Sequence, residues 1–150
     1  TANRFKDLYL SGGVYLGGTG AANKLDDYEE GTVTATMVPA TSGTITLGSS
    51  NILAYTKVGR VVHVQGMLQP TSVSSPVGAS VAVTLPFTAL GTGAAGQSER
   101  IGGSIAVASI GVASTPYRTF GGDTTLSIQI DASIITAGFQ FYIAFSYIAA

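Results

Sequence analysis

The sequence predicts an all-β fold, an antiparallel β-sandwich that is jelly-roll-like, and three observations lead to that prediction. Gly, Ser, Thr, Ala and Val dominate its 150 residues, of which 45% are apolar and only 10% charged. This mixture favours strands and tight turns over helices. Apolar and polar residues alternate over short runs, and Gly, Pro and Ser separate these runs. No stretch is predicted to form a helix longer than one turn.

The first 31 residues differ from the rest and are expected to form a stem. A short unit occurs twice, as Leu8-Tyr9-Leu10 and as Val14-Tyr15-Leu16, and small residues follow each copy. Units this short cannot bury a core alone, and they become stable when neighbours stack along the chain or from other chains. The candidate contacts between chains are therefore Leu8, Tyr9, Leu10, Val14, Tyr15 and Leu16. The alternative is a hairpin within one chain that turns at Ser11-Gly12-Gly13.

A patch of charge from Asp26 to Glu30 closes this stem and holds half of all acidic residues. It is predicted to form one helical turn, with Asp26 as N-cap, Glu29 in a capping box and Gly31 as terminator. A cation site or a pair of catalytic carboxylates are the functional alternatives. Adjacent carboxylates on an exposed turn do not raise the pKa of one of them, as a glycosidase requires. We therefore favour a capped linker whose charges meet solvent, Lys24 or an arginine of a neighbouring chain.

Residues 32–150 are expected to form a head domain. Its predicted strands are 32–38, 44–47, 52–58, 60–68, 79–85, 100–109, 124–130 and 139–148, with residues 110–113 either continuing the sixth or starting another. The segments 39–43, 48–51, 69–78, 88–99, 115–123 and 132–138 are predicted as turns or loops. A hairpin is expected around Gly59. Three strands should each place one apolar set on a single face: Val62, Val64 and Leu68; Leu126, Ile128 and Ile130; Phe139, Phe141, Ile143 and Phe145.

His63 is the single histidine of the chain. Without cysteine or a second histidine it has no partners for a metal site within one chain. In a trimer, three copies could meet at the axis and bind a metal or an anion. A histidine that is hydrogen-bonded at an interface or half exposed is the default interpretation. We therefore place His63 among the candidate interface residues and predict no metal and no cofactor.

The best candidate for ligand recognition is the predicted loop 115–123, which concentrates two aromatic residues, an arginine and an aspartate. Aromatic faces stack on sugar rings or peptide groups, and arginine and aspartate supply directed hydrogen bonds. The alternative is that the aromatic side chains fold inward and the arginine pairs with an acid of a neighbouring chain. The candidate residues are Tyr117, Arg118, Phe120 and Asp123, with Gln97 and Arg100 as polar groups that could join the same rim.

Composition and motifs exclude several other functions. A net charge of −1 gives no electrostatic attraction to nucleic acid or to an anionic membrane. No run of about eighteen apolar residues is present, so no membrane insertion is expected. There is no cysteine nucleophile, no Gly-x-Ser-x-Gly elbow and no more than one histidine for a serine triad. Asp123 and Asp131 flank a predicted strand, which is too little for a glycosidase. The sequence therefore predicts a protein that is not an enzyme.

The stem segment resembles one known family. RFKDLYLSGGVYLGG followed by ANKLDDYEEGT resembles the junction of bacteriophage tail fibres and related virion fibre proteins, where a slender trimeric shaft meets a distal domain. Residues 55–66 and the triplet Leu85-Pro86-Phe87 resemble the distal domain of that family. The resemblance covers roughly the first ninety residues. It implies a virion protein, assembled in the host cytoplasm, with a stem intertwined in a homotrimer.

The resemblance also implies a role for the head, which is attachment to a bacterial surface receptor such as a polysaccharide or an outer-membrane component. Two alternatives stay open. The head could be a purely structural domain that nucleates trimerisation and caps a shaft, or, less strongly supported, a glycan depolymerase module. The chain starts at Thr1 rather than at methionine, and we expect it to be a piece of a longer protein.

Overall fold

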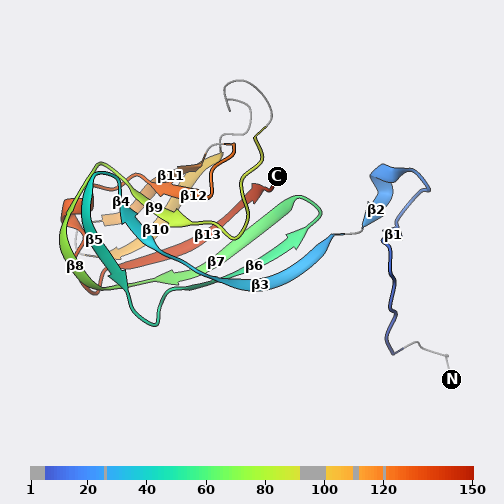
Figure 1. Cartoon of the computed structure of the whole chain (residues 1–150), viewed down its shortest axis with the longest axis horizontal. Coiled ribbons are helices and arrows are strands. Elements are labelled where there is room, and N and C mark those ends of the chain that lie inside the picture. The colour runs from blue at the N-terminus through green and yellow to red at the C-terminus, as the bar shows by residue number, and fades with distance from the viewer. Residues whose placement is uncertain (1–5, 26, 92–100, 110–111, 120) are drawn as a thin grey trace.

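The computed structural model describes residues 6–25, 27–91, 101–109, 112–119 and 121–150. These residues form an all-β chain in which the only helices are two 3-10 turns, η1 (Ala21–Asn23) and η2 (Ala132–Ile134). A two-stranded hairpin lies near the N-terminus and a larger sheet makes up the head (Figure 1). The predicted all-β class and the absence of longer helices are confirmed for the described part of the chain.

Eleven strands form one antiparallel sheet in the order β3-β6-β7-β13-β10-β11-β12-β9-β4-β5-β8. Their bounds are β3 Tyr28–Thr34, β4 Met37–Pro39, β5 Ser42–Leu47, β6 Ile52–Val58, β7 Val61–Leu68, β8 Pro70–Val77, β9 Val81–Thr84, β10 Ile101–Ser109, β11 Val112–Thr119, β12 Thr125–Ile128 and β13 Gln140–Ile148. The sheet curls so that its two halves face each other (Figure 1). The finer prediction of a jelly-roll-like sandwich is not confirmed, because one hydrogen-bonded sheet contains all eleven strands.

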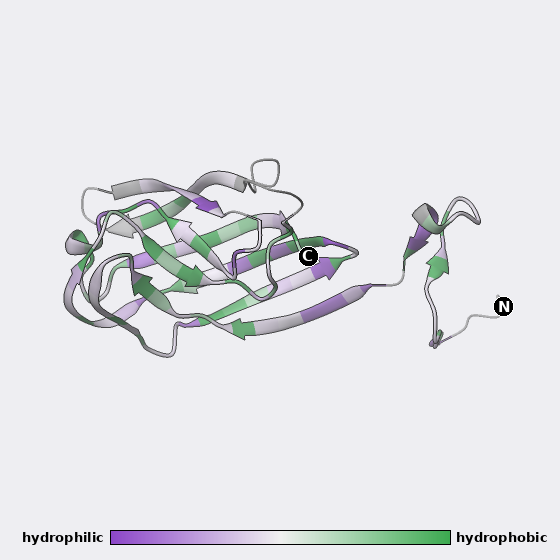
Figure 2. Ribbon diagram, turned by 45° about the horizontal axis from the view of Figure 1, so that its top comes forward, coloured by the Kyte–Doolittle hydropathy of each residue, from purple (hydrophilic) through white to green (hydrophobic). Residues whose placement is uncertain are grey.

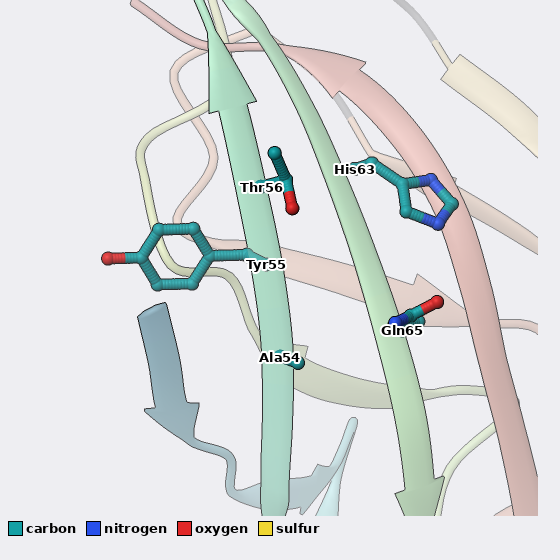
Figure 3. A pocket seen from close by; sticks show the side chains of 5 residues that line it. All are labelled: Ala54, Tyr55, Thr56, His63 and Gln65. Atoms are coloured by element: carbon teal, nitrogen blue, oxygen red, sulfur yellow. The ribbon is translucent and has the colours of Figure 1, made fainter. Parts of the chain in front are cut away.

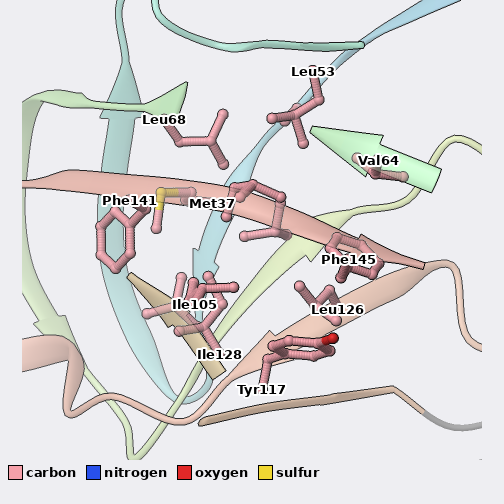
Figure 4. Close-up of a cluster of buried hydrophobic side chains, with 14 of the residues drawn as sticks. Met37, Leu53, Val64, Leu68, Ile105, Tyr117, Leu126, Ile128, Phe141 and Phe145 are labelled. Atoms are coloured by element: carbon pink, nitrogen blue, oxygen red, sulfur yellow. The ribbon is translucent and has the colours of Figure 1, made fainter. Parts of the chain in front are cut away.

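The core lies inside this curl and is built by the alternation that the sequence predicted. Side chains of successive strand residues point to opposite faces, so every second residue of a strand reaches the same side. On β7 and β13, which pair from Val61↔Ile148 to Leu68↔Phe141, these inward residues are fully buried or nearly so. Figures 2 and 4 show the apolar positions and the cluster they form. The buried side chains of the two strands are those of Val62, Val64, Leu68, Phe141, Ile143, Phe145 and Tyr147.

The hairpin around Gly59 is confirmed, and two predicted loops prove to be strands. Gly59 has a φ of +58° and joins β6 to β7. Residues 70–77, which are rich in Ser and Pro, form β8, an edge strand in which proline is tolerated because one side of the ladder needs no N–H donor. Residues 112–119 form β11. Its inward threonines are satisfied, since Thr115 donates to the carbonyl of Gln129 at 2.7 Å and Thr119 to that of Thr125 at 3.0 Å.

The predicted helical turn at residues 26–30 is wrong for the part that the structure describes. Residues from Tyr28 onward belong to β3, which pairs with β6 from Tyr28↔Val58 to Thr34↔Ile52. Seven residue pairs between β3 and β6 outweigh a single helical turn, which is unstable alone. Asp26 itself lies outside the described residues. The boundary predicted between residues 31 and 32 falls within a strand, and the sheet begins at Tyr28.

Tyr147 of β13 ties the final strand to the segment that follows β9. Its hydroxyl donates to the carbonyl oxygen of Phe87 at 2.9 Å and accepts the Phe87 N–H at 3.0 Å. The residue is 2% exposed. This burial raises the pKa of Tyr147 to about 12, and the hydrogen bond with Phe87 opposes the shift. The neutral hydroxyl is therefore the form that the folded chain holds.

Replacing Tyr147 with phenylalanine is expected to lower the free energy of unfolding by about 1 kcal/mol, because two backbone groups of Phe87 lose their partner. The effect depends on pH. An unfolded tyrosine ionises near pH 10 and the folded Tyr147 near pH 12, so wild-type stability should fall as pH rises through this window. Urea unfolding between pH 8 and 12 should show a shallower fall for Tyr147→Phe. Tyr142→Phe, on the outward face of the same strand, is the control. If the stability of Tyr147→Phe fell with pH as steeply as that of the wild type, the pH dependence could not be assigned to Tyr147.

Candidate interaction surfaces

The N-terminal segment forms a small hairpin whose apolar side chains are exposed. β1 (Val14–Tyr15) pairs with β2 (Lys24–Leu25), and the Leu16 N–H donates to the carbonyl of Asn23 at 2.8 Å. The chain turns between Leu16 and η1, not at residues 11–13 as the alternative interpretation had it. The six predicted contact residues of the stem are all exposed within this single chain, by fractions from 38% for Val14 to 90% for Tyr9: Leu8, Tyr9, Leu10, Val14, Tyr15 and Leu16.

An open groove of about 500 Å³ runs along this segment. It is lined mainly by apolar side chains and glycine, and its far end reaches the first residue of β3. A hairpin of two residue pairs is not stable by itself in water. The exposed side chains and the groove together make residues 6–25 a surface suited to further apolar contact. The lining residues are Leu8, Leu10, Gly12, Gly13, Val14, Leu25, Asp27 and Tyr28.

The predicted recognition loop is not assembled as expected. Tyr117 lies in β11 with its side chain in the core, 9% exposed, and its ring centroid is 5.3 Å from that of Phe145. This burial raises the pKa of Tyr117. Its ring face is therefore not available for stacking on a ligand, which agrees with the alternative that the aromatic side chain folds inward. Gly103, directly opposite on β10, leaves space for this ring, because a Cβ there would lie 2.9 Å from the Tyr117 hydroxyl.

Of the other five candidate recognition residues, the structure describes Arg118 and Asp123. Arg118 is exposed on β11, and Asp123 is half-buried between β11 and β12, where its carbonyl accepts the Ala89 N–H at 2.8 Å. Gln97, Arg100 and Phe120 lie outside the described residues. Of the six predicted residues, Arg118 is the one whose described side chain is exposed at the surface.

The acidic patch is engaged in contacts with the head. Asp27, which is half exposed, forms an ion pair with Lys57, and its carbonyl accepts the Gly59 N–H at 2.6 Å. Glu29 accepts a hydrogen bond from the Tyr55 hydroxyl at 2.5 Å, and Glu30 accepts one from Tyr28. These hydrogen bonds are the main cause that raises the pKa of each tyrosine. The described acids of this patch therefore contact Lys57, Tyr55 and Tyr28 of the sheet.

The sequence analysis did not identify Lys57 as a residue that stabilises the fold. It is 9% exposed, points inward from β6, and its ammonium lies 5.6 Å from the centre of the Phe87 ring. Phe87 also meets the Tyr55 ring edge-on at 5.1 Å. Its position in the strand could have indicated this burial, because Lys57 stands on the same face of β6 as the buried Leu53. Its partners lie thirty residues away in sequence on both sides and could not be read from that pattern.

His63 lies on the outward face of β7, where its Nδ1 is 3.1 Å from the Ser146 hydroxyl of β13. Figure 3 shows it beside Thr56 and Gln65, at a hollow of about 30 Å³. That volume holds about one water molecule and no sugar or peptide side chain. Among the described residues no three His, Asp or Glu side chains gather as a metal ligand set. The surface around His63 is thus shallow.

Two further grooves, of about 270 and 240 Å³, lie on either side of the Met37↔Ile45 pair. Met37↔Ile45 is the one residue pair that joins β4 to β5. Threonine side chains line both grooves, and the Thr36 hydroxyl meets that of Thr84 at 2.7 Å. Nothing in the sequence pattern signalled these grooves, because they depend on how far β4 and β5 separate.

Comparison with known proteins assigns no family to the chain. No family model matches the chain, and no curated protein matches it. Among solved structures, the chain is similar to the crystal structure of Dettilon tailspike protein (gp208), with a TM-score of 0.48 and 19% sequence identity. The alignment covers 81% of this chain and 23% of that protein, so the chain spans less than a quarter of its length. Neither helix among the described residues has the length and apolar run needed to cross a membrane.

Proposed function

We propose that the chain is the junction and distal head of a bacteriophage tail fibre or a related virion fibre. In this proposal three copies associate through the stem, and the head attaches to a bacterial surface receptor. The observation that carries it is the stem repeat, whose six apolar side chains are all exposed and of which Leu8, Leu10 and Val14 line an open groove. Exposed apolar patches of this kind mark surfaces that a partner covers. The resemblance of residues 4–32 to fibre junctions supports a partner that is the chain itself.

The first test is the mass of the chain in solution by light scattering. We expect three times the 15.2 kDa of one chain. Replacing Leu8, Leu10 and Leu16 together with serine should dissociate the assembly, because each loses apolar area that association would bury. Val38→Ser, at an exposed valine of β4, is the control and should leave the mass unchanged. A monomeric wild-type chain would contradict the proposed self-association. Any deletion of the stem has to stop before Asp27, since β3 begins at Tyr28.

Receptor attachment is tested by binding of the fluorescent, full-length chain to bacterial cells. Arg118→Ala, at an exposed strand position, should reduce binding while the mass and the circular dichroism spectrum stay unchanged. Binding that is equal in both proteins would remove Arg118 from the attachment site. A wild-type chain that assembles but binds no cells would favour the second candidate, a structural head that caps a fibre.

We expect no glycan hydrolysis. The acids Asp27, Glu29 and Glu30 are each engaged by a lysine or tyrosine of the sheet, and Asp131 accepts hydrogen bonds from Ser133 at 2.7 and 2.9 Å. These bonds lower the pKa of Asp131, which is the opposite of what a general acid needs. Release of reducing sugar from host polysaccharide by the wild-type chain would contradict this expectation and support a depolymerase.

A further inference from the structure

The outward face of β3, β6, β7 and β13 carries an apolar row. The strand register places Tyr28 opposite Val58, Val58 opposite Val61, and Val61 opposite Ile148. All four side chains lie on the outward face and are between 38% and 61% exposed. The row therefore crosses four neighbouring strands at one level of the sheet, and we call it the apolar row.

Beyond the apolar row, this face carries one charged side chain, Glu30 of β3. The next level contains Glu30, Thr56, His63 and Ser146, and the level after it Thr32, Ala54, Gln65 and Ala144. No charged side chain stands at an outward position of β6, β7 or β13, all of which the structure describes; Lys57 points inward. Charged residues make up about a quarter of an average domain and concentrate on its surface. The part of the face formed by β6, β7 and β13 therefore has a composition typical of a surface that another protein covers.

The shape of the face decides what can cover it. The hollow at His63 has room for about one water molecule, so a small ligand has no pocket there. Four strands about 4.8 Å apart, each with seven residues that rise about 3.3 Å, make a face of roughly 440 Å². A stable interface buries about 800 Å² on each partner. The face thus supplies about half of one interface, and a neighbouring surface has to supply the remainder.

The groove of the N-terminal segment is that neighbouring surface. Tyr28 belongs to both, since it lines the groove together with Leu8, Leu10 and Leu25 and also begins the apolar row. The two apolar regions are therefore continuous. We infer that the apolar row docks on a second copy of this chain, so that stem and head form one uninterrupted contact. This inference rests on the proposed self-association and extends it from the stem to the sheet. On β6, β7 and β13, the levels of Thr56 and Ala54 hold no aromatic platform and no charged side chain for a glycan, which favours the second copy.

The test is sedimentation velocity of full-length Val61→Asp over a range of concentrations. A carboxylate placed in the row would have to be buried without a partner on association. We expect the concentration for half-association to rise at least about 30-fold, the scale of an interface hot spot. Val77→Asp, an equally exposed valine of β8, is the matched control and should assemble as wild type does. Val61→Thr keeps shape and strand propensity and should give a smaller loss of about tenfold, which preserves the test if the aspartate variant does not fold.

The outcomes separate the two proposals. A wild-type monomer overturns the self-association and this inference with it. A wild-type assembly that the three leucine substitutions dissociate, but that Val61→Asp and Val61→Thr leave intact, overturns this inference alone. A monomeric wild-type chain whose binding to cells is lost in Val61→Asp would assign the apolar row to a bacterial surface protein and likewise overturn the inference.

Discussion

Replacing Gly43 with alanine is expected to lower the free energy of unfolding by about 3 kcal/mol. Gly43 has a φ of +86°, a conformation that costs an L-residue energy wherever it occurs. Here a Cβ would also collide with the backbone carbonyl of Ser75 and lie 2.6 Å from the Cα of Pro76. Gly43 stands where the register of β5 and β8 shifts, between the pairs Ser42↔Val77 and Thr44↔Ser74. Relief of the clash would require this edge strand to move away.

Gly138→Ala separates the steric clash from the backbone conformation. Gly138 has a nearly equal φ of +88°, but no heavy atom lies within 4 Å of a Cβ placed there. The substitution should cost about 1 kcal/mol, the conformational part alone. Urea unfolding of both variants at equal protein concentration gives the comparison, since association would make stability concentration-dependent. Equal losses in the two variants would show that β8 shifts without cost and would contradict the prediction.

Replacing Asp27 with alanine is expected to cost about 2 kcal/mol. The substitution leaves the Lys57 ammonium nearly buried, with the Phe87 ring as its remaining described partner. Removing one member of a fully buried ion pair costs about 3–5 kcal/mol, and the half-exposed carboxylate of Asp27 reduces that figure. Lys57→Met keeps most of the aliphatic side chain and removes the charge, so it should cost less than about 1 kcal/mol.

The double variant Asp27→Ala, Lys57→Met completes a thermodynamic cycle. We expect its stability to equal that of Lys57→Met within about 0.5 kcal/mol, because the aspartate has nothing left to neutralise. Chemical unfolding of the four proteins measures the coupling. Additive losses would mean that the loss in Asp27→Ala does not arise from the ion pair, since alanine keeps the backbone carbonyl that accepts the Gly59 N–H.

The alternation of side chains along single strands could be predicted from the sequence. It holds for β7, β12 and β13, because successive side chains of a strand alternate between faces whatever the strand pairs with. The hairpin at Gly59 could be predicted for the same kind of local reason, since a glycine between two such runs supplies the positive φ. The exposed apolar repeat of residues 8–16 is likewise a property of the local sequence, and it is the part of the candidate site that the sequence located.

Only the tertiary structure decided which segments become strands when their own composition is neutral or misleading. Residues 28–31 join the sheet because β6 supplies their backbone hydrogen-bonding partners. Residues 70–77 join it because β5 supplies theirs. Tyr117 turns inward because Gly103 on the neighbouring strand leaves room for its ring, so the predicted recognition loop is not a loop. The apolar row exists only through the register of four strands from distant parts of the chain. Strand pairing and ion pairs such as Asp27–Lys57 join residues far apart in sequence, and their free energy depends on partners that no local pattern contains.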